Sequence, residues 1–159
     1  MEPPAGGRTR IRLPAEAYRQ PGSCWHVTIG VECGSPFLDA GLATAVAGLI
    51  EKRCAALGAA FGAYCLMPDH GHLVLSVGTT GLIDIVRDVK SRSTRLWWQH
   101  GGAGSLWQRS FYDRGLRTEQ AWREAVRYVL EIPQRAGLVE AWGKYPFLGG
   151  LGVVVDGDR

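Results

Sequence analysis

Two histidines separated by one residue form a candidate metal site. His70 and His72 begin a stretch, HGHLVLSV, whose apolar and β-branched residues predict a strand that ends at Val77. Because side chains alternate along a strand, both imidazoles would project from the same face. Neutral imidazoles bind first-row metals and leave open positions for water and substrate, and such an ion can stabilise charge during phosphoryl transfer. The pattern is short, however, and two ordinary histidines at a sheet edge would produce it as well.

A tyrosine could supply the nucleophile for the same chemistry. Its hydroxyl can attack a DNA phosphorus and hold the strand as a phosphotyrosine, which divides one exchange into two steps. Its free pKa of about 10 makes it weak at neutral pH, so it needs a polarised phosphate or a nearby base. Spacing alone does not choose among Tyr18, Tyr64, Tyr112, Tyr128 and Tyr145. An aromatic residue on an amphipathic helix is more often part of the core.

Basic residues interleave with aromatic residues in two parts of the chain. A single nucleic-acid strand needs cations for its phosphates and aromatic faces for its bases. The candidate DNA-binding residues are Arg87, Lys90, Arg92, Arg95, Arg109, Arg114 and Arg117. The alternative interpretation is that the tryptophans belong to the core and the arginines face water. A net charge of +3 and a pI near 8.8 are compatible with nucleic-acid binding without requiring it.

The elements that must position these residues follow from hydrophobic periodicity and from turn residues. Strands are predicted at 24–31, 61–67, 70–77 and 106–116, and helices at 38–60, 81–100 and 118–132, with Thr118 as an N-cap and Pro133 ending the last helix. The order β-α-β-β-α-β followed by a further helix predicts an α+β, ferredoxin-like fold, with an antiparallel sheet and helices on one face. RNA-recognition modules share this order, so the fold alone does not decide the function.

Length and composition fit one domain. The chain has 159 residues, no Cys-x-x-Cys pair that would indicate a zinc ribbon, and no apolar run long enough for a transmembrane helix. Residues 1–17 are interpreted as a flexible arm, residues 18–148 as the domain and residues 149–159 as a tail. The arm lacks the apolar core of a signal peptide, so we expect a cytoplasmic protein.

A resemblance to a known family appears where residues 67–75 read MPDHGHLVL. This text is similar to the HUH signature of single-tyrosine transposases of the REP-associated, IS200-like type, Met-Pro-Asn/Asp-His-hydrophobic-His. Residues 107–114 resemble the second landmark of the family, and residues 127–139 resemble the third. The resemblance covers roughly Tyr18 to Leu148.

The resemblance implies a metal-dependent endonuclease and strand transferase acting on single-stranded DNA. Tyr128 would be the nucleophile and would form a 5′-phosphotyrosine, with Tyr112 as the fallback. His70 and His72 would bind Mg²⁺ or Mn²⁺. The implied partner is single-stranded or hairpin DNA, and family members act as monomers or homodimers.

Two positions depart from the family pattern. Ile132 replaces an asparagine that lies one helical turn after Tyr128 and helps to ligate the metal in the family. Either water or Glu131 completes the metal shell, or the chain is a catalytically impaired protein that binds DNA hairpins. Gly71 replaces a bulky apolar residue, which should cost strand stability more than chemistry. A third reading, an RNA-recognition-like domain, requires exposed aromatics on two central strands, which this sequence supplies poorly.

Overall fold

The computed structural model describes residues 12–150, so residues 1–11 of the predicted arm and 151–159 of the predicted tail lie outside the described residues. Its elements are α1 (Ala15–Arg19), β1 (Cys24–Gly30), η1 (Pro36–Leu38), α2 (Ala40–Ala56), β2 (Ala60–Met67), β3 (His70–Ser76), α3 (Leu82–Gln99), β4 (Tyr112–Leu116), α4 (Glu119–Arg135), η2 (Trp142–Lys144) and β5 (Leu148–Gly149). The α+β order predicted from the sequence is confirmed. The domain boundaries at residues 17 and 148 remain predictions.

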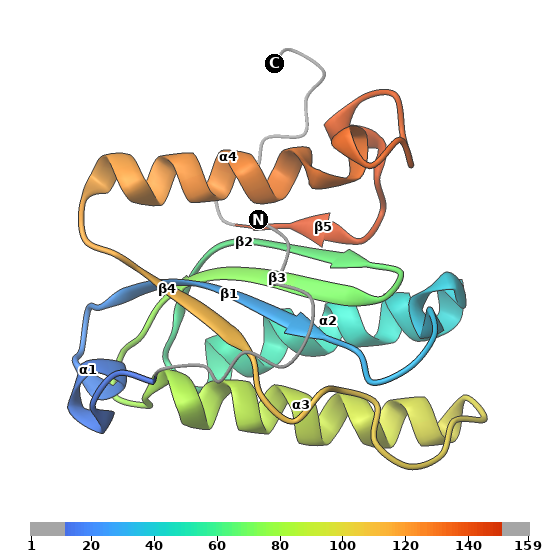
Figure 1. The fold of residues 1–159 in the computed structure, drawn as a ribbon, viewed down its shortest axis with the longest axis horizontal. Helices are drawn as coiled ribbons and strands as arrows, with labels where there is room; N and C mark the ends of the chain where they lie inside the picture. Colours follow the sequence, from blue (N-terminus) through green and yellow to red (C-terminus); the bar gives the residue numbers. More distant parts are fainter. Residues whose placement is uncertain (1–11, 151–159) are drawn as a thin grey trace.

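The strands form one antiparallel sheet in the order β4-β1-β3-β2-β5, with β1 and β3 at its centre. Helices α2 and α3 cover one face of this sheet, and α4 lies across the other (Figure 1). The prediction of helices on one face therefore holds for the first two long helices, while the additional helix covers the opposite face. No helix within residues 12–150 is long and apolar enough to span a membrane.

Alternation along the strands gives the two faces different chemistry. Trp25 and Val27 of β1 and Leu75 of β3 belong to the large apolar cluster that packs under α2 and α3. The intervening residues, among them His26 and His72, lie on the face beneath α4. The sheet thus has an apolar face and a partly polar face.

Helix α4 begins where the sequence predicts and ends later. The Thr118 side chain accepts a hydrogen bond from the backbone N–H of Ala121, as expected of an N-cap. The prediction that Pro133 ends the helix was wrong, because α4 continues to Arg135. Proline removes a single hydrogen bond near the end of the helix, and its ring is buried, so packing outweighs that loss. Gly137, with φ of 77°, then terminates the helix.

The predicted strand at 106–116 is regular only from Tyr112 onward. Before it, the chain makes a single bridge between Val31 and Trp107. The Lys90 ammonium group donates hydrogen bonds to the carbonyls of Arg109 and Ser110, at 3.1 and 3.4 Å. A side chain from α3 therefore satisfies backbone groups that a strand would otherwise pair.

A close approach between α4 and β2 depends on a glycine. The register of β2 against β3 shifts around Gly62, and a Cβ atom there would lie 2.6 Å from the Trp122 ring. Glycine therefore lets the helix rest directly on the sheet. Near the C-terminal end of β2, the Tyr145 hydroxyl donates to the Leu66 carbonyl at 2.7 Å.

Candidate active site

The structure brings the histidine pair and Tyr128 together between the sheet and α4. The rings of His70 and His72 have centroids 4.9 Å apart, with an interplanar angle of 77°. The centroid of the Tyr128 ring lies 6.3 Å from that of His72. The two histidines share one face of β3, as strand alternation predicts, and Tyr128 of α4 lies beside them.

His70 presents a nitrogen suited to binding a cation. Its Nδ1 lies 2.7 Å from Oδ1 of Asp69, and because an ionised carboxylate can only accept, Nδ1 carries the proton. In the neutral ring the opposite nitrogen, Nε2, therefore has a lone pair. This atom is buried without a hydrogen-bond partner among the described residues. Such an orphaned acceptor costs about 1–3 kcal/mol, and a bound divalent ion would satisfy it.

His72 is more deeply buried, with 2% of its surface exposed. Burial, and then the neighbouring His70, lower the pKa of His72 to about 2. The imidazole is therefore neutral at physiological pH, which is the form that binds metals. Together with the orphaned nitrogen of His70, this ring provides two imidazole nitrogens that could hold a divalent first-row ion.

A third histidine, which the sequence interpretation did not assign to the site, adjoins this pair. Nε2 of His26 lies 3.1 Å from Nδ1 of His72, and Oγ1 of Thr28 lies 3.2 Å from the same atom. Burial, with a further contribution from Arg114, lowers the pKa of His26 to about 4. Strand alternation places His26 and Thr28 on one face of β1, but only the sheet register brings them to His72.

The structure does not bring Glu131 into a cluster of metal ligands. Within residues 12–150, no group of three or more His, Cys, Asp or Glu side chains is arranged to hold a metal ion. The Glu131 carboxylate instead pairs with the guanidinium of Arg135 at 3.3 Å. Ile132 is 8% exposed and belongs to the apolar cluster that includes Met67 and Cys65.

Arg135 is a second residue that the sequence interpretation did not assign to the site. Its guanidinium carbon lies 4.5 Å from the centroid of the Tyr128 ring, and Nη2 donates to the Tyr128 carbonyl at 2.9 Å. The signal was the seven-residue separation, which places two residues on the same helical face. A cation therefore lies over the ring of the candidate nucleophile.

The candidate DNA-binding residues fall into two separate regions. Arg114, on the edge strand β4, pairs in register with His26 and so lies on the α4 side of the sheet. Arg117 follows β4 and is exposed. Arg87, Lys90, Arg95 and Arg109 lie instead around a groove on the α3 side. Arg92 joins neither region, because it pairs with Asp88, which also holds Arg53 of α2.

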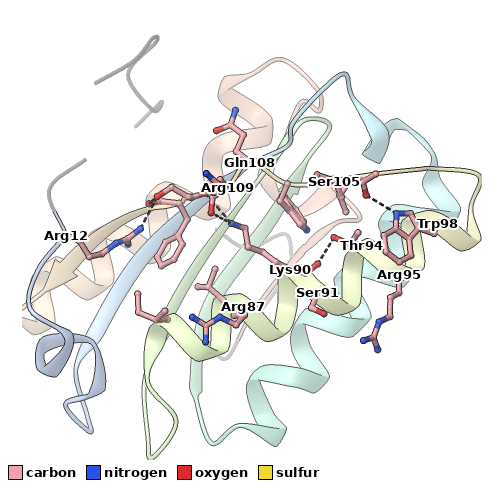
Figure 2. Close-up of a pocket in the computed structure, with 17 residues that line it drawn as sticks. Arg12, Arg87, Lys90, Ser91, Thr94, Arg95, Trp98, Ser105, Gln108 and Arg109 are labelled. Carbon is pink, nitrogen blue, oxygen red and sulfur yellow. Dashed lines mark hydrogen bonds between the residues drawn. The ribbon is translucent and has the colours of Figure 1, made fainter. Parts of the chain in front are cut away.

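The groove, of about 830 Å³, runs between α3 and residues 104–111 (Figure 2). Its positive charge comes from Arg12, Arg87, Lys90, Arg95 and Arg109, and no acidic residue is among its lining side chains in the described part of the chain. Trp98 lines one end and is 51% exposed. Cations beside an exposed aromatic face suit a nucleic-acid strand.

A family model described as "Transposase IS200 like" matches residues 23–129, which is more than half of the chain. This chain belongs to the IS200-like transposase family. The matched range contains all three clustered histidines and Tyr128 but stops before Ile132. Membership of this family supports a role for the chain in DNA processing.

Solved structures resemble this IS200-like transposase in fold. One is a REP-associated tyrosine transposase bound to a REP hairpin, with 18% sequence identity and a TM-score of 0.69, covering 89% of this chain and 82% of that one. Another is a putative transposase from Deinococcus radiodurans R1, with 19% identity and a TM-score of 0.52, covering 78% of this chain and 94% of that one. No curated protein matches the sequence.

Proposed function

We propose that this IS200-like transposase cuts and joins single-stranded DNA, with Tyr128 as the nucleophile and a divalent ion, Mg²⁺ or Mn²⁺, held by His70 and His72. The observation that carries this proposal is the orphaned, buried Nε2 of His70 beside a neutral His72. A lone pair facing no protein donor is expected where a cation binds.

The residues of the chain prepare the site for that ion. When bound, it would polarise the scissile phosphate and stabilise the charge that develops there. Asp69 accepts from Nδ1 of His70 and thereby selects, in the neutral ring, the tautomer whose lone pair is on Nε2. Glu131 would act as a third ligand only after leaving Arg135, so we propose that His70 and His72 are the principal protein ligands.

Tyr128 would perform the covalent step. Its hydroxyl oxygen forms a bond to the scissile phosphorus, and the bond from phosphorus to the 3′ oxygen breaks. The phenolic proton passes to water, and the departing 3′ oxygen takes up a proton to become a free hydroxyl. The product is a 5′-phosphotyrosine, which the 3′ hydroxyl of a second strand can attack in the reverse sense. The Arg135 guanidinium over the ring favours the developing phenolate.

The two basic regions suggest a path for the DNA. The groove segment 104–111 leads directly into the edge strand β4, where Arg114 lies on the same face as His26. We propose that a strand bound in the groove by Arg95 and Arg109 crosses this edge to reach Tyr128. A hairpin is the proposed form of the DNA, since the REP-associated relative is bound to one.

A second candidate function is hairpin binding without cleavage. It is favoured by Ile132, which offers no ligand and lies in an apolar cluster, and by the lack of a three-ligand group in residues 12–150. Such a protein would keep the basic groove and lose the covalent step.

The test uses labelled single-stranded DNA hairpins, incubated with the protein in the presence and absence of Mn²⁺ and separated on denaturing gels. We expect an adduct that requires Mn²⁺ and is lost in Tyr128→Phe and in His70→Ala. Tyr112→Phe is the matched control and should keep the adduct. Tight binding in gel shifts without any adduct would instead support the hairpin-binding function.

A further inference from the structure

The contact between His26 and His72 joins two imidazole rings in a buried part of the site. Each neutral ring carries one proton, and the 3.1 Å separation of His26 Nε2 and His72 Nδ1 allows one proton between them. One ring must donate and the other must accept.

The two alternatives have opposite consequences for metal binding. If His26 donates, Nδ1 of His72 accepts, and the proton of His72 lies on Nε2, where it blocks that atom from binding a cation. If His72 donates from Nδ1, its Nε2 keeps a lone pair. The hydroxyl oxygen of Thr28, at 3.2 Å, can share the Nδ1 proton in this second arrangement.

The surroundings of His70 distinguish between these alternatives. A proton on Nε2 of His72 finds no acceptor at His70, because Nε2 of His70 has no hydrogen-bond partner among the described residues. With the proton on Nδ1 of His72, the Nε2 atoms of His70 and His72 can each offer a lone pair to one cation. The second arrangement is therefore the one compatible with the ion of the proposed function.

We infer that His26 and Thr28 are positioning residues that hold the His72 proton on Nδ1 and so leave Nε2 of His72 free to bind the metal. This inference rests on the proposed function for the identity of the ligand. A metal-bound histidine commonly donates the N–H of its other ring nitrogen to a carboxylate or a carbonyl. Here His26, on the neighbouring central strand, would accept that hydrogen bond from His72. Because no group of three ligands is found among the described residues, the orientation of the two imidazoles matters more.

The first experiment measures the tautomer of His72 directly, by ¹⁵N NMR of the histidine rings in the metal-free, full-length chain at neutral pH. We expect the wild-type ring to be protonated on Nδ1. Thr28→Val, which keeps the shape of the side chain, and His26→Leu should each shift His72 toward a mixture of tautomers. His26→Gln keeps an acceptor oxygen and should restore much of the wild-type state. His100→Gln, at the end of α3, is the matched control and should change nothing at His72.

The second experiment measures Mn²⁺ affinity by electron paramagnetic resonance on the same variants. Loss of a group that orients a metal ligand typically weakens binding by about 10- to 100-fold. We expect a change of this size for His26→Leu and a smaller one for His26→Gln. A wild-type His72 protonated on Nε2 would overturn the inference without any variant. Unchanged tautomer and affinity in both Thr28→Val and His26→Leu would also overturn it.

The outcome for the proposed function is separate. If the wild-type protein forms no DNA adduct while the tautomer of His72 still depends on His26, the positioning role stands and the nuclease proposal fails. If the adduct forms and the tautomer is indifferent to His26, the reverse holds.

Discussion

The two faces of the sheet are formed by the same strands but differ in the polarity of their side chains. The face under α2 and α3 is apolar, and the ion pair between Arg53 and Asp88 ties the two helices together above it. The face under α4 carries His26, Thr28 and His72, which are three of the four buried polar residues found within residues 12–150. A helix packed over polar groups gains less from apolar burial, so the α2–α3 face holds most of the stability and the α4 face can hold a reactive site.

The largest expected effect is on the α4 face, where function and stability should separate. His70→Ala should reduce adduct formation by about 100-fold or more, because it removes one of the two proposed metal ligands. The melting temperature of the metal-free protein should stay the same or rise, since the change also removes a buried acceptor without a partner. Adduct gels and thermal denaturation measure the two properties. A large loss of metal-free stability would show that His70 is instead a structural residue.

On the opposite face, truncation should act on stability alone. Leu75→Ala should lower the free energy of unfolding by about 2–5 kcal/mol, because Leu75 is fully buried in the large cluster. Urea denaturation measures the change. The adduct formed per folded molecule should equal that of the wild type, and a specific loss of adduct would contradict the division between the faces.

A single substitution in α4 should move stability and metal binding in opposite directions. Ile132→Asn places an amide in the apolar cluster with Met67, which should cost about 2–4 kcal/mol. The same amide would offer an oxygen ligand one helical turn from Tyr128, so Mn²⁺ affinity should rise under the proposed function. Urea denaturation and Mn²⁺ titration test both, and Ile132→Val is the control for the change in packing alone. An unchanged affinity would mean that position 132 does not reach the ion.

Substitutions in the basic groove should affect DNA binding rather than the covalent step. Arg95→Ala combined with Arg109→Ala should weaken hairpin binding and reduce the slope of log affinity against log salt by about 2, because two phosphate contacts are lost. Fluorescence anisotropy at several salt concentrations measures the slope. Arg92→Ala should change it less, since Arg92 pairs with Asp88 outside the groove. Equal changes in the slope for each removed arginine, inside and outside the groove, would show that net charge rather than the groove determines binding.

The smallest expected effect concerns Gly71, which lies between the two histidines and faces the other side. A Cβ atom there would meet Leu66 at 3.5 Å, an ordinary contact, and alanine loses less conformational entropy than glycine. Gly71→Ala should therefore raise the free energy of unfolding by about 0.5–1 kcal/mol and leave the adduct unchanged. Urea denaturation resolves a change of this size. A destabilised variant would show that the methyl group does not fit beside Leu66.

Local patterns determined much of this protein. Side-chain alternation placed His70 and His72 on one face, and hydrophobic periodicity set the order of the elements. Thr118 marked the start of α4 through its own hydrogen bond. The continuation of α4 through Pro133 could not be predicted in this way, because burial of the ring outweighs a local preference.

The tertiary structure decided the parts that depend on distant residues. His26 lies 46 positions from His72, and only the register between β1 and β3 makes them neighbours. The candidate DNA-binding residues look alike in sequence, yet the sheet separates Arg114 from Arg95. Sequence spacing fixes which residues share a face of one element, while pairing and packing between elements fix which faces meet. The histidine pair was therefore predictable from the sequence, and its contacts with His26 and Thr28 were not.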